Sequence, residues 1–542
     1  MKKLLWISFY FLLFSLALSN SFKYLDPDFG WHLQVGHDSV ISQDVPRENI
    51  YNFSYTGNWV NHEWFSDVIL FYVYDNLGYI SLSVLFALLV TLTFALLAYY
   101  LKRIKPEISS YAIMTFQLIG FYACLPHFGI RIQEFALLFL LLILIIIDYF
   151  VRKRKAYIPF LLIPLMYLWS ITHGSFLMGF AVLFAFLFYK LLESIVLKYR
   201  TIEMIDSRAA LNIKEIGLFF VAIIAAWLST LLSPYKFELY SFLSGYRDTF
   251  YLTHIQEWLP QHFFPFQYPQ MIYLAIILLG YVLYVFYKLK KKEKFDLWHF
   301  IALLIFVLAS FKSRRHFPLA VIATFPLVME SWRSLLDIGN SQTKDDNVKD
   351  ENIFFRYLKS RKIIIHFLMF TILATSTNLL LTTKFNNNPF LSFCHSYPCQ
   401  AVNYLASNSE YDDLKLFNEY GWGGYLIHQL PERKIFIDGR LPQVQYKEHT
   451  FLEEYYEFFR IDKHDQPKAG DKLEEHEINL VLLKRNDVMI KPKKWESFVF
   501  GINSDDIKVK NSLREYLEKS SEWEDVYKDD TSIIYKRKSP IY

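Results

Sequence analysis

Long apolar blocks separated by short polar segments dominate the first 382 residues. The runs at 82–101, 135–151 and 271–286 carry almost no charge. An α-helix rises about 1.5 Å per residue, so about 20 apolar residues cross the hydrocarbon core of a bilayer. The pattern predicts about eleven membrane spans, near 4–20, 79–101, 109–126, 134–151, 157–172, 174–196, 214–233, 269–288, 297–311, 317–335 and 362–382.

The residues after the last predicted span follow a different pattern, with many Lys and Glu. Alternating segments predict strands at 414–420, 434–440, 478–485 and 531–538, and helices at 451–460 and 512–520. Strands that alternate with helices are typical of a small α/β domain. We therefore expect an α-helical polytopic membrane domain over 1–382, with a long first outer loop at 21–78, and an extracytoplasmic α/β domain over 383–542.

The distribution of Lys and Arg predicts the orientation in the membrane. With the N-terminus inside, the inside segments hold 25 Lys and Arg and the outside segments hold 8. Positive residues favour the inner side, so the C-terminal domain is expected outside. The first apolar segment also resembles a cleaved signal peptide, which leaves every later orientation unchanged. The net charge of +4 gives no support for a nucleic-acid partner.

The chain has three cysteines, and two of them follow the last predicted span on the outer side. Cys394 and Cys399 are close in sequence, and an oxidising compartment favours a disulfide between them. A metal pair is less favoured because no further Cys lies nearby. Cys124 lies within a span and is expected to be a packing residue.

Polar and charged side chains gather on the predicted outer side, next to hydrocarbon. They are Asp26, Asp28, His32, His62, Glu63, Arg131, His173, Glu257, Arg314, Arg315 and His316. Charged groups at membrane depth are costly, so they indicate a site. Arg with carboxylates and His suits an anionic lipid headgroup, because Arg binds phosphate oxygens and a carboxylate moves a proton or binds a metal.

At these residues the sequence resembles a large bacterial membrane family of the GT-C class of glycosyltransferases. The resemblance runs nearly end to end. Its motifs are DPDFGWHLQVGHD (26–38), VPRENIYNFSYTGNWVNHEW (45–64), RIQEF (131–135), THGSF (172–176), EW (257–258), SRRH (313–316) and NEYGWGGYLIHQLPERKIFIDGR (418–440). Trp169 to Gly174 matches the Trp-x-x-x-His-Gly pattern of the family. Ile132 stands where the family has Pro, which puts the shape of that turn in doubt but not the Arg.

The resemblance implies transfer of a sugar from a polyprenyl phosphate or pyrophosphate in the outer leaflet of a bacterial cytoplasmic membrane. The acceptor is a glycan, a lipid or a protein of the envelope. An acidic residue of the first outer loop acts as base, and some members bind a divalent cation such as Mg or Mn. We expect Asp28, or else Asp26, as the base, with the other carboxylate as a helper.

The remaining site residues receive roles from the same resemblance. A metal would be held by Asp26, Asp28 and His32. The candidates for binding the phosphate are Arg131, Arg314 and Arg315, and those for other contacts with substrate or metal are His62, Glu63, His173, Glu257 and His316.

Structural roles are the alternatives for several of these residues. Asp26-Pro27-Asp28 also fits a turn and an N-cap, because Asp is among the best capping residues. Arg314 and Arg315 also fit headgroup anchors at a span end. Asp438 and Arg440 either approach the membrane site or pair with each other. The alternative function is a non-catalytic transport or assembly protein for envelope polysaccharide or lipid; a receptor is less favoured, because the short inside loops leave little room for signalling.

Overall fold

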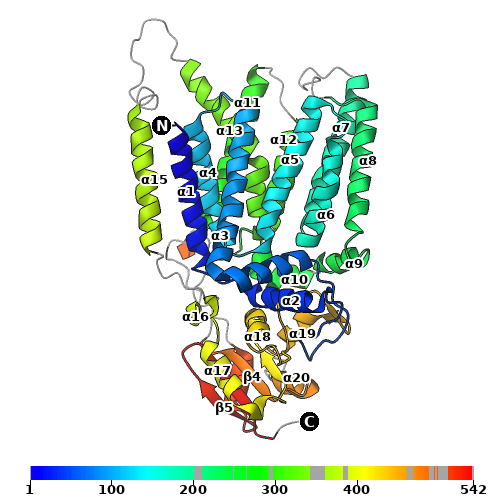
Figure 1. Cartoon of the computed structure of the whole chain (residues 1–542), viewed down its shortest axis with the longest axis vertical. Coiled ribbons are helices and arrows are strands. Elements are labelled where there is room, and N and C mark those ends of the chain that lie inside the picture. The colour runs from blue at the N-terminus through cyan, green and yellow to red at the C-terminus, as the bar shows by residue number, and fades with distance from the viewer. Residues whose placement is uncertain are drawn as a thin grey trace. The chain divides into compact units, whose positions relative to one another are not determined.

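The computed structural model describes residues 2–199, 210–247, 249–263, 265–291, 297–341, 361–381, 388–460, 468–486, 494, 497–498 and 511–539 (Figure 1). The polar segment 342–352 lies outside these residues. Each of the predicted spans coincides with a helix. These helices are α1 (Lys2–Ser21), α3 (Trp64–Ile104), α4 (Ser110–Cys124), α5 (Phe135–Lys153), α6 (Leu162–Thr172), α7 (Phe176–Tyr199), α8 (Ile213–Thr230), α11 (Tyr268–Lys291), α12 (Leu297–Lys312), α13 (Phe317–Ser341) and α15 (Arg361–Leu381).

Within the described residues, six helices are long and apolar enough to cross a membrane. They are Lys3–Ser21, Trp64–Ile104, Ile132–Lys153, Phe176–Ile195, Ile213–Thr230 and Tyr268–Lys291. Their lengths, from 18 to 41 residues, meet the requirement of a hydrocarbon core about 30 Å thick. The chain is therefore a multi-pass membrane protein, as the sequence predicted.

Contacts between residues divide the chain into two compact units. The first unit contains Met1–Tyr24, Ser83–Lys236 and Glu257–Phe385, and the second contains Leu25–Leu82, Phe237–Gln256 and Asn386–Tyr542. The segment 21–78, which was expected to belong to the membrane domain, lies for the most part in the second unit with the C-terminal region.

Helix α3 passes from one unit to the other and is broken at Gly78. This residue has φ 79° and ψ 176°, which is a conformation that glycine adopts at little cost. The part of α3 that begins at Trp64 and the span predicted from residue 79 therefore meet at Gly78. The break redirects the chain where the first helix ends and the membrane span begins.

The C-terminal part of the second unit contains a four-stranded sheet in the order β1-β4-β6-β5. Its strands are β1 (Leu416–Asn418), β4 (Leu480–Lys484), β5 (Trp523–Lys528) and β6 (Ser532–Arg537). β1 and β4 are parallel, and the other pairs are antiparallel. The helices of this region are α16 (Pro389–Ser392), α17 (Cys399–Ser407), α18 (Gly423–Gln429), α19 (Phe451–Glu457), α20 (Ala469–Glu475) and α22 (Ser512–Lys519), and a hairpin joins β2 (Gln445–Tyr446) to β3 (His449–Thr450).

A disulfide joins Cys394 and Cys399 at the start of this region, and Cys124 is a buried free thiol. The disulfide closes the short loop between α16 and α17. The second unit also contains α2 (Phe29–Ser42), α9 (Glu238–Ser244) and α10 (Thr249–His254).

The segment before α3 pairs with the C-terminal sheet through its backbone. Asn52 forms a parallel bridge to Ile435, and Ile435 forms another to Leu416 of β1. The Phe53 N–H donates to the Ile435 carbonyl over 3.2 Å, and the Ile435 N–H donates to the Tyr51 carbonyl over 3.0 Å. Residues 434–440, predicted as a strand, thus form only these bridges, and they join two segments that lie about 380 residues apart in the sequence.

Helix α2 packs closely on α18 through two glycines. A Cβ atom on Gly30 would lie 2.2 Å from the Gly424 carbonyl oxygen, and a Cβ atom on Gly424 would lie 2.3 Å from the Pro27 carbonyl oxygen. Real Cβ atoms do not approach an oxygen so closely, so both positions require glycine for the backbones to meet. This packing, together with the bridges at Ile435, explains why residues 25–82 belong to the second unit.

A Gly424→Ala substitution is therefore expected to lower the free energy of unfolding by about 1–3 kcal/mol, because the added methyl group forces the helices apart. Alanine is the better helix former, so any loss isolates the steric effect. Thermal unfolding of the purified protein measures the change. Gly421→Ala is the control, since a Cβ atom there meets nothing within 4 Å; equal losses for both variants would contradict the close approach.

Candidate functional site

Asp28 lies at the first turn of α2, where the sequence predicted a base or a helix cap. It occupies the N-cap position, but its side chain makes no capping hydrogen bond. Its Oδ1 atom instead accepts a hydrogen bond of 2.9 Å from the Trp31 indole. Asp26 accepts a bond of 2.9 Å from the Asp28 backbone N–H, which is a typical contact of an Asx turn. Asp26 therefore stabilises the turn, and the Asp28 carboxylate contacts the Trp31 side chain rather than the helix backbone.

His32 follows one turn later on α2 and contacts a buried carboxylate. Its Nδ1 atom lies 2.6 Å from Asp67 Oδ1, and the Asn61 amide donates to Asp67 Oδ2 over 2.6 Å. The Asn61 side-chain oxygen in turn accepts from the Glu63 N–H over 3.1 Å. Burial lowers the pKa of His32, but the negative charges of Asp67, Glu63 and Asp28 outweigh burial and raise it above its usual 6.5.

Asp67 was not singled out from the sequence, although it is the central acceptor of this group. The signal was present, because Asp67 is a charged residue in the otherwise apolar run WFSDVILFYVY. It was overlooked because one polar position per turn is normal on an amphipathic surface helix. In the structure its side chain is fully buried.

The neighbouring pair His62 and Glu63 was predicted as a substrate or metal contact. His62 Nε2 lies 3.3 Å from Glu63 Oε1, and the His62 ring packs against Phe242 with centroids 5.4 Å apart. His62, Glu63 and Phe242 all belong to the second unit.

Arg440 and Asp438 pair with each other, which was one of the two alternatives. Arg440 Nε and Nη2 donate to the two Asp438 oxygens, each over 2.8 Å, and Nη2 also donates to Asn52 over 3.0 Å. The guanidinium lies 4.5 Å from the Tyr51 ring and 4.7 Å from the Trp59 ring. A buried ion pair thus holds the segment 51–59 against residues 438–440 of the C-terminal region.

The first unit contains a separate charged group at one end of its helices. Arg131, in the turn between α4 and α5, donates to Glu257 over 2.6 Å. Burial would raise the pKa of Glu257, but the charges of Arg131 and Arg315 outweigh it and hold the pKa at about 2. His127, which the sequence analysis did not select, lies near the same charges; burial and then Arg131 lower its pKa to about 4.

Arg315 and His173 extend this cationic group. Arg315 Nη2 lies 3.1 Å from His173 Nε2, and the guanidinium lies 5.1 Å from the Trp258 ring. His173 Nδ1 contacts the Ser175 hydroxyl over 2.7 Å. Four loops that are far apart in the sequence, near residues 131, 173, 257 and 315, therefore meet within the first unit.

Arg314 and His316 differ from the predicted contacts. The Arg314 side chain is only 3% exposed, and it donates to the carbonyls of Pro260 and Phe263. It therefore fixes the loop after Glu257. The ring of His316 packs edge-on against Trp258, with centroids 6.0 Å apart, and burial lowers its pKa to about 4. His316 is thus a neutral packing group at neutral pH.

The predicted divalent cation does not fit the start of α2. Among the described residues, ligand atoms of three His, Cys, Asp or Glu side chains lie within 4.8 Å of one another only at Glu454, Glu475 and His476. Asp26, Asp28 and His32 form no such group; Asp28 accepts a hydrogen bond from Trp31, and His32 contacts Asp67. We therefore assign no metal to these three residues.

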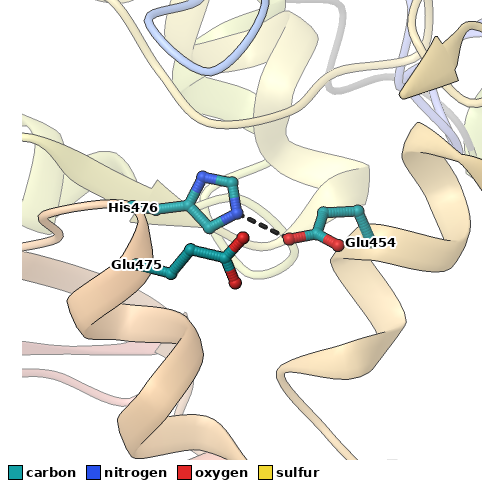
Figure 2. A group of neighbouring side chains, drawn as sticks. All are labelled: Glu454, Glu475 and His476. Atoms are coloured by element: carbon teal, nitrogen blue, oxygen red, sulfur yellow. Dashed lines mark hydrogen bonds and ion pairs between the residues drawn. The ribbon is translucent and has the colours of Figure 1, made fainter. Parts of the chain in front are cut away.

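The group at Glu454 lies between α19 and α20 (Figure 2). His476 Nε2 lies 2.6 Å from Glu454 Oε1, and His449 Nε2 lies 2.8 Å from Oε2. These ligand types suit zinc. However, the Lys472 ammonium lies 2.9 Å from Glu454 and 2.8 Å from Glu475, so a metal would have to displace it. The arrangement is a neutralised ion-pair network that joins the two helices.

The Glu454 network predicts a defined acid sensitivity. Burial would raise the pKa of Glu454, but hydrogen bonds from His476, Lys472 and His449 hold it at about 2, below the usual 4.5. A lowered pKa stabilises the fold above pH 4.5, and this contribution disappears as the pH falls to about 2. Glu454→Gln is expected to lower stability at pH 7 and to flatten its decline between pH 4.5 and 2. Unfolding followed against pH measures both effects, with exposed Glu474→Gln as control; a Glu454→Gln variant with the wild-type decline would refute this assignment.

Comparison with known proteins gives the fold. No family model and no curated protein sequence matches the chain. The apo oligosaccharyltransferase of Archaeoglobus fulgidus matches with a TM-score of 0.51 and 11% identity, covering 89% of this chain and 69% of that one. The archaeal oligosaccharyltransferase AglB of the same organism, solved with an inhibitory peptide and a dolichol-phosphate, gives 0.50 and 11% over the same shares. The A. fulgidus enzyme tethered to an acceptor peptide with the NVT sequon gives 0.50 and 11%, covering 98% of this chain and 74% of that one.

These matches establish the fold and no more, because the identity is so low. The chain is a helical membrane protein with a C-terminal mixed α/β region and a fold like that of AglB, a membrane glycosyltransferase of the GT-C type. The fold class expected from the sequence is thus confirmed at this level.

Proposed function

We propose that this protein is a membrane glycosyltransferase that moves a sugar from a polyprenyl phosphate or pyrophosphate to an envelope acceptor. The likeness to AglB over 89% of the chain is the observation that carries this proposal. That protein was solved with a dolichol-phosphate, which is a phosphorylated polyprenol. A second protein with the same fold is a reasonable candidate to use a sugar donor of the same chemical class.

The cationic group of the first unit suits the phosphate of such a donor. Arg131 carries five N–H donors, and its ion pair with Glu257 is made through Nη1. Arg315 adds a second guanidinium beside His173. Fixed positive charges stabilise the negative charge that develops on a departing phosphate. We assign Arg131 and Arg315 to the donor phosphate, and Glu257 to the orientation of Arg131.

The carboxylate of Asp28 suits the hydroxyl group of the acceptor. A carboxylate accepts several hydrogen bonds at once, so Asp28 has the chemistry to accept one from an attacking hydroxyl in addition to the bond from Trp31. Asn at this position would keep the shape but lose the charge. The distribution of Lys and Arg supports placing this reaction on the outer face of a bacterial cytoplasmic membrane.

Transfer of radiolabelled sugar from a panel of polyprenyl-phosphate and pyrophosphate donors, in membranes that contain the purified protein, tests the proposal. Wild-type protein is expected to transfer label, and Asp28→Asn is expected to transfer it about 100-fold more slowly without a lower melting temperature. Asp44→Asn, an exposed carboxylate before α3, serves as the matched control. Wild-type protein that transfers no label from any donor would refute the proposal and favour a transport or assembly role.

A further inference from the structure

His127 lies at the end of the short turn η1 (Leu125–His127), between α4 and Arg131. Two helices of the first unit hold this turn. Asn20 of α1 donates through its side-chain amide to two backbone carbonyls beside His127. Gln270 of α11 contacts the ring itself, with its Nε2 atom 2.9 Å from His127 Nε2. The turn and its imidazole are therefore fixed by α1 and α11, within a single unit of the fold.

The contacts of the Gln270 amide determine which ring nitrogen of His127 carries the proton. Gln270 Nε2 lies 3.3 Å from the carbonyl oxygen of Ala123, which can only accept, so the amide nitrogen and not the amide oxygen must face it. Gln270 Oε1 accepts from Gln261 over 2.7 Å, in agreement with this orientation. Because the same amide nitrogen contacts His127 Nε2, this ring atom must accept. The proton of the neutral ring therefore lies on Nδ1.

The Nδ1–H group of His127 makes no hydrogen bond with the residues that the structure describes. The residue as a whole is only 7% exposed. Nδ1 is nevertheless not one of the fully buried side-chain atoms that lack a partner, so it remains within reach of a ligand or of solvent. A donor in a largely buried ring favours a bound acceptor, because a hydrogen bond that is not made there costs free energy.

The charges around His127 keep its ring neutral. Burial and then the positive charge of Arg131 lower its pKa to about 4; Glu257 opposes this effect, and Arg315 adds to it. Electrostatic effects decrease with distance, so these three charged residues lie near the ring. They are the residues assigned above to the donor phosphate and to the orientation of Arg131. His127 thus adds an uncharged N–H donor beside two guanidinium groups.

We propose that His127 binds the phosphate of the lipid-linked sugar donor through its Nδ1–H group, beside Arg131 and Arg315. This inference rests on the proposed function and adds a residue to its donor site. Hydrogen bonds to a charged acceptor are shorter and stronger than those between neutral groups. A neutral imidazole can stabilise negative charge through its N–H without giving up the proton. His127 is therefore a binding residue for the donor rather than an acid.

Two substitutions of His127 separate its two ring nitrogens. Asparagine places an amide nitrogen near the position of Nδ1, so it keeps the donor but loses the contact with Gln270. Glutamine reaches the position of Nε2 and accepts from Gln270 through its oxygen, but it has no donor at Nδ1. We expect His127→Gln to weaken the binding of polyprenyl phosphate by about 10- to 100-fold, and His127→Asn to bind it much as the wild-type protein does.

Isothermal titration of the purified protein with polyprenyl phosphate measures this binding, and melting temperatures show whether each variant is folded. His262→Gln is the matched control, because His262 is an exposed histidine of the same unit. Polyprenol lacks the phosphate and is expected not to respond to His127→Gln, whereas inorganic phosphate shows whether the phosphate alone is recognised. Wild-type affinity in His127→Gln would overturn the proposal. Equal losses in both His127 variants would also overturn it, because the contact with Gln270 would then be the cause.

The position of the ring proton can be measured without any donor. In protein labelled with ¹⁵N-histidine, the resonances that disappear in His127→Gln are expected to show a protonated Nδ1 and a bare Nε2 at neutral pH. A proton on Nε2 would overturn the proposal, because Nδ1 would then repel a phosphate oxygen.

The sugar-transfer assay distinguishes a failure of this inference from a failure of the proposed function. Sugar transfer with the same donor KM in wild-type protein and His127→Gln would contradict the role of His127 while the function remained. Wild-type protein that binds polyprenyl phosphate with the expected dependence on His127, but transfers sugar from no donor, would contradict the proposed function while the phosphate site remained.

Discussion

Arg131→Gln is expected to lower kcat/KM for a polyprenyl-phosphate sugar by at least about 100-fold, which is typical when one fixed stabiliser of a developing anion is removed. Glutamine cannot carry the charge that the departing phosphate requires. The substitution also leaves Glu257 without the Arg131 guanidinium, which lies 2.6 Å from it. The uncompensated Glu257 carboxylate would then repel the donor phosphate. Donor titrations in the transfer assay measure this loss.

Arg152→Gln provides the control for this prediction. Arg152 lies at the other end of α5 and pairs with Asp148 over 2.9 Å, with 44% of its side chain exposed. Exposed pairs contribute little, so its loss is expected to leave transfer unchanged. Equal effects of the two substitutions would show that Arg131 acts on stability alone. A normal rate for Arg131→Gln would remove it from the donor site.

The membrane helices were predictable because their signal is local. Each span is a run of apolar residues whose length the bilayer sets, so no knowledge of distant contacts is needed. The strands β1, β4 and β6 were found for a similar reason, since each is a buried apolar run. Strand β5 (Trp523–Lys528) was missed because most of its side chains are at least partly exposed, and its polar sequence does not differ from that of a loop.

The contacts of residues 25–82 with the C-terminal region could not be predicted in the same way. They depend on backbone bridges at Ile435 and on the close approach at Gly30 and Gly424, which join segments separated by hundreds of residues. A short pairing of this kind leaves no periodic pattern. The charged residues of the candidate site were visible in the sequence, but the contact between His32 and Asp67 was not.

Substitution of Arg440 is the second change for which we expect a large effect, here on stability. Arg440 is 3% exposed, and its guanidinium pairs with both Asp438 oxygens and lies close to the rings of Tyr51 and Trp59. Arg440→Met keeps much of the side-chain volume but leaves the buried Asp438 carboxylate without its counter-charge. Breaking one partner of a buried pair typically costs about 3–5 kcal/mol. We therefore expect a markedly lower melting temperature and faster proteolysis between residues 45 and 60.

A double substitution separates the lost charge pair from lost packing. Asp438→Asn combined with Arg440→Met removes the unpaired charge, so the pair should be more stable than Arg440→Met alone. Arg485→Met is the exposed control, because its partner Asp530 is fully solvated and the pair contributes little. If Arg440→Met had the same melting temperature as Arg485→Met, the ion pair would not be what holds residues 51–59 against the C-terminal region. If the double variant were no more stable than Arg440→Met, the aromatic contacts with Tyr51 and Trp59 would account for the loss instead.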